Sequence, residues 1–423
     1  MEASLYVHVP FCAGGKCDYC DFYSVPIKPS GLYSADSRPG RFVETVLLEA
    51  ERLFETCSPS VIPTLYIGGG TPSVLGSEGI RKLLDGLSER ISRFSPPPVE
   101  ITVEANPESA DEAFLAACRE GGATRLSLGI QTLYGPSREA VHRVGSGHRP
   151  TEQGSSEQGS AELCSEEKLL RRRLALAAEY FPSAFSVDLM SGLPFQNERI
   201  LLDDIDAILS HRPAHVSLYA LTVEKGTPLA ANAAAAATAL EAKSTHDKPF
   251  LPSRDEADQL WLCGRDALEK SGYGQYEVSN FCLAGQESRH NIRYWLMKNW
   301  LALGPSASGT IINDETGTGL RYTNPKDADA WLAGKTKETL DRLTLVKETL
   351  LMGFRYIKGP DEDLFRRRFH SSIGELVPKT LSAWQSRGFL QKDRIALTKE
   401  GLLFLDPFLL DSFQELDVSF FAC

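Results

Sequence analysis

The sequence predicts an α/β fold, a partial (β/α)6 TIM-like barrel followed by additional strands and a helical C-terminal module. Three observations carry this prediction. Six short apolar runs alternate with longer stretches whose apolar residues recur near a period of 3.6. The short runs are apolar throughout, as in strands that are buried on both faces. Consecutive β-then-α units favour parallel strands joined by right-handed crossovers.

The six predicted strands follow one another in the first half of the chain. They cover residues 5–9, 64–68, 99–105, 125–130, 184–190 and 215–221. Amphipathic helices are expected between them, for example over 41–57 and 77–94. A later run, "GYGQYEVSNF" (272–281), is expected to be the strand that closes the barrel.

Two stretches resemble insertions into this pattern. Residues 147–167 are rich in Gly, Ser, Glu and Gln, so we expect a mobile loop there. The Ala-rich run over 229–249 is expected to be either a marginal helix or a linker. These breaks suggest three domains, with bounds 1–230, 231–335 and 336–423.

The C-terminal module has a different texture. Two or three helices precede "FLQKDRIALTKEGLLFL" (389–405), which is typical of a hairpin followed by a helix, as in a winged-helix domain. Such modules often bind DNA, but the one basic run within this module, Arg366–Arg368, lies among Asp and Glu. The formal net charge of -11 also argues against nucleic acid, so we expect a packing role.

Composition excludes several further classes. The chain of 423 residues is 42% hydrophobic and 24% charged, which is typical of a globular protein. It has no run of 18 apolar residues, so we expect no transmembrane segment. Because a cysteine cluster begins at Cys12, we expect no signal peptide before it. Nine cysteines, of which six are scattered, suit a reduced cytoplasm rather than a disulfide framework.

Three cysteines, Cys12, Cys17 and Cys20, form a Cys-x4-Cys-x2-Cys cluster, and thiolates this close favour a soft metal. A structural zinc site would need a fourth ligand, such as His8 or Asp21. A plant-type ferredoxin site would need a distant fourth cysteine, such as Cys57. A third alternative is a [4Fe–4S] cluster with three cysteine ligands and one open iron. Spacing alone leaves all three open.

Motifs at successive strand ends favour the third alternative. The segments "LYVHVPFC…KCDYCDF", "YIGGGTPS", "VEANP", "LGIQTL", "VDLMSGLP" and "LYALTVEKGTPL" appear in order. Together they resemble the radical S-adenosylmethionine (SAM) superfamily, and more narrowly the oxygen-independent coproporphyrinogen oxidases and their relatives. The resemblance implies that the open iron binds SAM and that an electron from the cluster cleaves it to a 5′-deoxyadenosyl radical.

The same resemblance implies a set of site residues. The three cysteines bind the cluster, Tyr6 and Tyr19 flank SAM, and the glycine motif meets its amino-acid portion. The glycines are also expected to expose backbone N–H groups. Polar residues where apolar strands end line the rest of the pocket, at the barrel rim where ligands bind. The implied residues are Tyr6, Tyr19, Gly69, Gly70, Thr71, Glu104, Gln131, Asp188 and Ala220 for SAM, and Cys12, Cys17 and Cys20 for the metal.

Two departures from the family pattern stand out. The family spacing is Cys-x3-Cys-x2-Cys, so the loop here carries one extra residue. Gly14 and Gly15 can adopt positive φ and bulge that residue outward while the three sulfurs converge. An arginine expected after the glutamine motif aligns with Ser146, and Arg143 lies about one turn early.

Two functions follow from the resemblance. The oxidases carry one more cysteine where this chain has Phe22, and a longer N-terminal extension before the motif. Both differences resemble the heme chaperone (HemW) branch, which binds heme and passes it to acceptor proteins. The alternative is a radical SAM enzyme acting on a porphyrinogen. An electron donor and a homodimer are further expectations for partners.

A His-Asn-x-x-Tyr-Trp motif in "RHNIRYW" (289–295) matches the chaperone branch. His290 is a candidate heme ligand, because histidine is a common axial ligand of heme iron. The alternative is a histidine that packs where the barrel meets the C-terminal module. The sequence does not separate the two.

Overall fold

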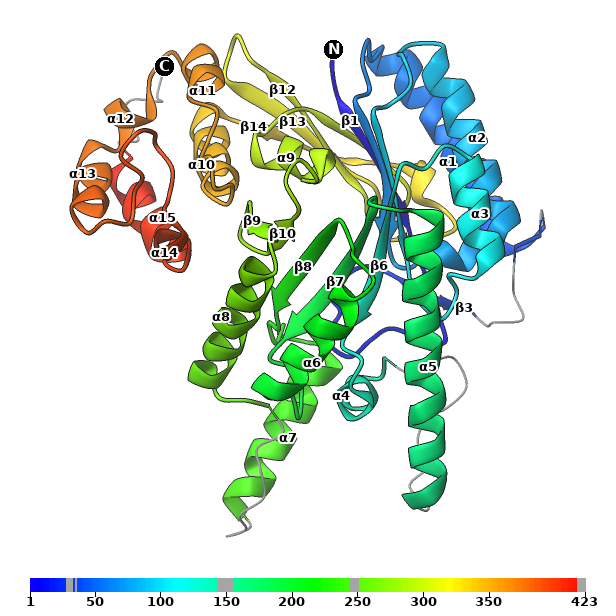
Figure 1. Ribbon diagram of the computed structural model, residues 1–423. Helices are drawn as coiled ribbons and strands as arrows, with labels where there is room; N and C mark the ends of the chain where they lie inside the picture. The colour runs from blue at the N-terminus through cyan, green and yellow to red at the C-terminus, as the bar shows by residue number, and fades with distance from the viewer. Residues whose placement is uncertain (28–32, 35, 144–155, 243–250, 417–423) are drawn as a thin grey trace.

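A parallel sheet forms the centre of the chain. The computed structural model describes residues 1–27, 33–34, 36–143, 156–242 and 251–416. Six strands pair in parallel, each with the next (Figure 1). They are β1 (Ser4–Val9), β4 (Thr64–Gly69), β5 (Glu100–Ala105), β6 (Arg125–Gln131), β7 (Phe185–Ser191) and β8 (His215–Ala220). The predicted six β-then-α units are confirmed.

Helices cover the outside of this sheet. They are α1 (Arg38–Cys57), α2 (Gly76–Ser92), α3 (Glu112–Glu120), α4 (Gly135–Ala140), α6 (Glu198–Leu209) and α8 (Arg254–Lys270), with the short 3₁₀ turn η1 (Pro72–Leu75). Local sequence sets their ends. The Ser37 hydroxyl accepts the Gly40 N–H at the start of α1, and Ser58 ends it in a left-handed conformation.

The first inserted stretch is largely a helix. Helix α5 spans Ser156–Tyr180, so the mobile loop expected over 147–167 is wrong from Ser156 onward. Residues 147–155 lie outside the described part of the chain. The helix is anchored because Leu170, Leu174 and Ala177 share one face and are buried in the core. The helix-forming Ala, Leu and Glu residues before them extend it.

The second inserted stretch is also helical. Helix α7 spans Pro228–Ala242, which settles the choice between a helix and a linker for that part of the run. Residues 243–250 lie outside the described residues.

Four strands extend the sheet beyond β1. They are β11 (Trp300–Leu303), β12 (Ser308–Asn313), β13 (Thr318–Thr323) and β14 (Thr336–Leu340), with η2 (Trp331–Ala333) before the last. β11 pairs in parallel with β1, and the three that follow form an antiparallel meander.

The expected closing strand does not close the barrel. The 272–281 run contributes β9 (Gly274–Gln275) and the start of β10 (Asn280–Cys282), which pairs antiparallel with β8. Within the described residues the strand order is β14-β13-β12-β11-β1-β4-β5-β6-β7-β8-β10-β9, an open sheet. β1, which closure would have to reach, already pairs with β4 and β11. The run therefore adds to an edge.

A buried carboxylate fixes the meander to the barrel. Glu49 of α1 is 2% exposed. Its Oε1 accepts hydrogen bonds from Asn324 and Lys335, and its Oε2 accepts from the Gly304 N–H and the Trp331 indole, each at 2.8 Å. All four donors come from the segment that follows β11, so one side chain satisfies groups on four parts of the extension.

Replacing Glu49 by alanine is expected to lower the free energy of unfolding by ~3 kcal/mol, because the half-buried Lys335 ammonium and three neutral donors lose their buried acceptor. Glu51, two residues along α1, is the matched control. Its partly exposed ion pair with Arg93 predicts a loss of at most ~1 kcal/mol for Glu51→Ala. Urea unfolding followed by circular dichroism measures both. Similar losses in the two variants would contradict the role given to Glu49.

The C-terminal helices form a second core beside the meander, at the left of Figure 1. They are α10 (Arg342–Gly353), α11 (Glu362–Phe369), α12 (Ile373–Leu376), α13 (Pro378–Ser386), α14 (Lys399–Leu402) and α15 (Leu405–Glu415). The expected hairpin is reduced to one antiparallel bridge, between Leu390 and Leu397. Arg368 of the basic run is buried against Asp314, so that run is partly structural.

Among the described residues, no helix combines the length and the apolar character that crossing a bilayer requires.

Candidate functional site

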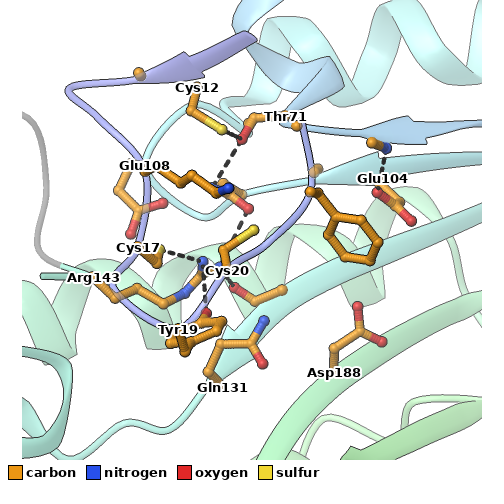
Figure 2. Close-up of a pocket in the computed structure, with 18 of the residues that line it drawn as sticks. Cys12, Cys17, Tyr19, Cys20, Thr71, Glu104, Glu108, Gln131, Arg143 and Asp188 are labelled. Carbon is orange, nitrogen blue, oxygen red and sulfur yellow. Dashed lines mark hydrogen bonds between the residues drawn. The ribbon is translucent and has the colours of Figure 1, made fainter. Parts of the chain in front are cut away.

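The three clustered cysteines lie at one end of the sheet, beside a cavity of about 420 Å³. Cys12 lies in β2 (Phe11–Ala13), which pairs with β3 (Val25–Ile27), and Cys17 and Cys20 lie in the loop between them. The opposite wall is formed by residues at the carboxyl ends of the parallel strands. Figure 2 shows the cysteines on one side of the cavity and the Glu104 and Asp188 carboxylates on the other.

Ten of the predicted residues line this one cavity. They are Cys12, Cys17, Tyr19, Cys20, Gly69, Gly70, Thr71, Glu104, Gln131 and Asp188. Because the carboxyl ends of parallel strands meet at one rim, residues more than 170 positions apart are brought together.

The extra residue of the cysteine loop is accommodated by its two glycines. Gly14 and Gly15 have φ values of 74° and 137°, in the region that only glycine adopts without strain. A Cβ at Gly15 would meet no atom within 4 Å, so the backbone bulges into open space there. The predicted positive φ at both glycines and the outward bulge are confirmed, whereas the convergence of the three sulfurs stays a prediction.

Each sulfur has a distinct environment. The Thr71 hydroxyl lies 3.7 Å from Cys12 Sγ, and an Arg143 N–H donates to Cys17 Sγ at 3.4 Å. Burial raises the pKa of the Cys20 thiol. No three His, Cys, Asp or Glu side chains gather as ligands of a single ion among the described residues. A cubane cluster takes each thiolate on a different iron, so three separate thiolates around one cavity fit it.

Cys57 does not take part in this site. It is the last residue of α1, and it is absent from the residues that line the cavity. The structure therefore gives no support to a ferredoxin-like set that uses Cys57 as its fourth ligand.

The glycine motif works through close packing rather than through exposed N–H groups. The Gly69 N–H donates to Glu104 Oε2 at 3.1 Å, and the Gly70 N–H donates to the Val9 carbonyl. A Cβ at Gly69 would lie 2.6 Å from the His8 ring, and one at Gly70 would lie 2.6 Å from the Phe11 carbonyl oxygen. The expectation of exposed N–H groups is therefore wrong for these two residues.

Two half-buried carboxyl groups, those of Glu104 and Asp188, lie on the cavity wall opposite the cysteines. Glu104 Oε1 accepts the Tyr66 hydroxyl at 2.6 Å, and burial raises the pKa of Glu104 to about 7 despite that bond. Burial also raises the pKa of Asp188, whose two oxygens lie 3.4 Å from the Ser127 hydroxyl. The wall of the cavity thus carries two acidic groups with raised pKa values, and a cationic ligand beside them would favour their charged forms.

Gln131 is held in a strained conformation with an unsatisfied acceptor. Its φ is 67°, and its buried Oε1 has no hydrogen-bond partner. The Asp204 carboxylate fixes the next two residues, by accepting the Thr132 hydroxyl at 2.5 Å and the Leu133 N–H at 2.9 Å. A ligand hydroxyl would satisfy the orphaned oxygen of Gln131, so this residue fits a sugar-bearing cofactor.

Arg143 is a buried cation of the site. It is 8% exposed, and its guanidinium donates to the Gly129 carbonyl, Asn106 Oδ1, Cys17 Sγ and the Tyr19 hydroxyl. In the sequence, Arg143 lies about one turn before the position at which the family pattern predicts an arginine. Helix α4 ends at Ala140, and His142 has a φ of 50°, which turns Arg143 into the cavity. Ser146 lies outside the described residues.

Two of the predicted SAM contacts are not in the cavity lining. Tyr6 lies in the middle of β1 and is not among the residues that line the cavity. Its hydroxyl is 3.0 Å from His8 Nδ1, and its ring packs on Tyr66. Ala220 ends β8 and is exposed outside the cavity. Asn106, Phe22 and His142 line the cavity and were not predicted. Asn106 lies within the "VEANP" motif, which was its available signal.

His290 lies at the opposite end of the sheet. It belongs to α9 (Arg289–Trp295), and its ring nitrogens contact the Thr64 hydroxyl at 2.8 Å and the Tyr294 hydroxyl at 3.2 Å. It is 1% exposed, and burial lowers its pKa to about 3. Heme ligation through His290 is therefore contradicted, because both nitrogens are engaged and the ring has no accessible edge.

Comparison with known proteins places the chain in a family. The model of the radical SAM superfamily matches residues 6–208. The mouse "Radical S-adenosyl methionine domain-containing protein 1, mitochondrial" is 31% identical over 96% of this chain and 82% of its own length. The "Heme chaperone HemW" of Escherichia coli is 27% identical over 96% and 97%, respectively.

The fold is also similar to that of a solved structure. The solved structure of the coproporphyrinogen III oxidase HemN from Escherichia coli superposes with a TM-score of 0.70, at 18% identity, over 98% of this chain and 90% of that one. The open parallel sheet, the cysteine loop at its carboxyl end and these similarities lead to one assignment. The chain belongs to the radical SAM superfamily and, within it, to the HemW family.

Proposed function

We propose that the cavity holds a [4Fe–4S] cluster on Cys12, Cys17 and Cys20, with SAM on the iron that no cysteine ligates. Three thiolates and a fourth position without a protein sulfur are the donor set that supports this proposal. When bound, the cluster supplies electrons and a Lewis-acidic iron.

The chain's own residues complement the charges of SAM. Arg143 is the cation available to its carboxylate, and Glu104 is the acceptor for its amino group. Gln131 and Asp188 offer acceptors for ribose hydroxyls. Arg143 is buried, and Glu104 and Asp188 are half-buried in the cavity wall, where a low local dielectric strengthens each contact.

The binding of SAM is expected to depend on the ionisation of Glu104. The charged carboxylate accepts hydrogen bonds from the amino group and attracts the sulfonium cation more strongly than the neutral acid does. Because the pKa of Glu104 is raised to about 7, the group becomes charged only as the pH approaches neutrality. Affinity should therefore rise by about tenfold from roughly pH 5.5 to 7.5. Calorimetric titration of the reconstituted protein measures it. The Glu104→Gln variant keeps its shape and should show a flat profile, and an unchanged rise in that variant would contradict the assignment.

We further propose that the protein is a heme chaperone, which binds heme and transfers it to acceptor proteins in a reducing compartment such as the cytoplasm. The observation that carries this proposal is Phe22. This side chain lines the cavity and is 64% exposed, at the position where the oxidases carry an additional cysteine. An apolar ring at the mouth suits a flat apolar macrocycle.

The experiment is a heme titration of the full chain beside an anaerobic turnover assay. The chaperone proposal expects a saturable Soret shift and transfer of that heme to an apo-acceptor. It also expects no decarboxylation of coproporphyrinogen when SAM and dithionite are added. Sustained decarboxylation would establish the alternative, a porphyrinogen oxidase, and absence of any Soret shift would remove the heme proposal.

A further inference from the structure

The exclusion of His290 raises the question of which side chain ligates the heme, and the following inference rests on the proposed chaperone function. The chain has eight histidines, of which His148 and His246 lie outside the described residues. His8, His215 and His290 are at most 5% exposed, and in each of them both ring nitrogens have hydrogen-bond partners. None of the three can reach an external iron.

Among the remaining described histidines, His142 alone lines the cavity. Its side chain is 48% exposed, and Nδ1 lies 2.7 Å from Asp18 Oδ2. Nε2 has no partner among the described residues, so a lone pair is available at the mouth. His211 and His370 lie away from this cavity, and the Nε2 of His370 already contacts the Glu315 carbonyl.

The Asp18 carboxylate orients the His142 ring. Asp18 is 6% exposed and accepts a second hydrogen bond, from Asn232 Nδ2 at 3.2 Å. Its own backbone is fixed on both sides, since its N–H donates to the Val141 carbonyl and its carbonyl accepts the Leu229 N–H. A carboxylate on one ring nitrogen sets the tautomer that leaves the other free, which is the usual support of a metal-ligating histidine.

The backbone at His142 carries a second sign of constraint. Its φ of 50° is uncommon for a residue other than glycine, and such strain persists where the surroundings hold it in place. The same turn aims Arg143 into the cavity and leaves His142 at its mouth. The buried guanidinium of Arg143 is thus available to SAM inside the cavity, and the exposed imidazole of His142 is available to a second ligand at its mouth.

The rim around His142 has the chemistry of a heme contact. The exposed ring of Phe22 and the Met190 side chain line the same cavity and offer apolar surface for a macrocycle. Lys16 is an exposed cation on the cysteine loop and also lines the cavity, and no described residue forms a hydrogen bond or ion pair with it. It is a counter-ion for a propionate carboxylate.

We propose that His142 is an axial ligand of heme bound across the mouth of the cavity, with Asp18 as its positioning residue. The heme then lies over the space that SAM occupies, and the two cofactors share one entrance. Heme binding and SAM binding are therefore coupled at this rim rather than across the length of the barrel.

The test is hemin titration of the full, cluster-reconstituted chain, followed by optical and EPR spectra of the ferric heme. In His142→Ala we expect loss of the histidine-ligated low-spin signal and its return when free imidazole is added. In Asp18→Asn we expect the same signal with an affinity weaker by about tenfold. His370→Ala is the matched control and should behave as the wild type. Iron content and circular dichroism verify folding of each variant.

The outcomes separate this inference from the function on which it rests. No Soret shift in the wild type would refute the chaperone proposal itself. A wild-type shift that persists unchanged in His142→Ala, or that is lost in His148→Ala instead, would overturn the assignment of His142 and leave the chaperone proposal standing. Should His142→Ala fail to fold, His142→Gln keeps the hydrogen bond to Asp18, and its spectrum decides the question in the same way.

Discussion

The Cys17→Ser variant is expected to lose the iron–sulfur cluster, with iron falling from about four atoms per chain towards none. Cys17 is the cysteine whose Sγ accepts an Arg143 N–H at 3.4 Å. A serine hydroxyl at this position is a far poorer ligand for iron. Because three thiolates hold the cluster and the fourth iron has no protein ligand, loss of one thiolate leaves too few anchors.

The control is Cys57→Ser, a half-buried cysteine outside the cavity. We expect it to retain wild-type iron and sulfide content after anaerobic reconstitution. Iron loss in Cys57→Ser together with Cys17→Ser would favour a four-cysteine, ferredoxin-like centre. Full retention of iron in Cys17→Ser would contradict the proposed ligand set.

The Arg143→Met variant is expected to weaken the affinity for SAM by about 10- to 100-fold, since a charge-assisted hydrogen bond contributes ~1.5–3 kcal/mol. The guanidinium is buried and donates to Cys17 Sγ, while methionine preserves much of its volume without charge. Equilibrium titration of the reconstituted protein with SAM measures the change.

Lys16→Met is the matched control for this variant, because it removes the same charge from the exposed rim of the same cavity. Exposed charges are screened by water and salt, so its effect on SAM should be small. Equal losses in the two variants would indicate a general electrostatic attraction and would contradict a specific contact from Arg143.

The strands and the cysteine site were predictable because both depend on local pattern. A strand buried on both faces must be apolar throughout, and β1, with Leu5, Val7 and Val9 fully buried, reads that way in the sequence. The cavity follows, since parallel strands bring their carboxyl ends to one rim. Ten predicted residues meet there for that topological reason.

Other features depend on contacts that a sequence does not reveal. The position of Arg143 rests on the early end of α4 and the left-handed turn at His142, neither of which follows from periodicity. The burial of His290 depends on Thr64, which lies 226 positions away. The sheet stays open because β11 pairs with the edge of β1 that a closing strand would need. The sequence does not show which of these distant strands pairs with β1.

The helix at Ser156–Tyr180 illustrates a third limit. Its Gly, Ser and Glu content resembles that of a loop, yet its C-terminal half presents a buried apolar face. Tertiary packing of one half stabilises helix in the part that precedes it, because adding a turn to an existing helix costs less than starting one. Composition over a short window does not register this cooperativity.

The most direct measurement is the EPR spectrum of the reduced, anaerobically reconstituted protein, recorded with and without SAM. We expect about four irons and four sulfides per chain, a [4Fe–4S] signal, and a clear change in that signal when SAM binds the iron left open by Cys12, Cys17 and Cys20. A protein that instead holds zinc, or a two-iron centre whose spectrum is indifferent to SAM, would contradict the account.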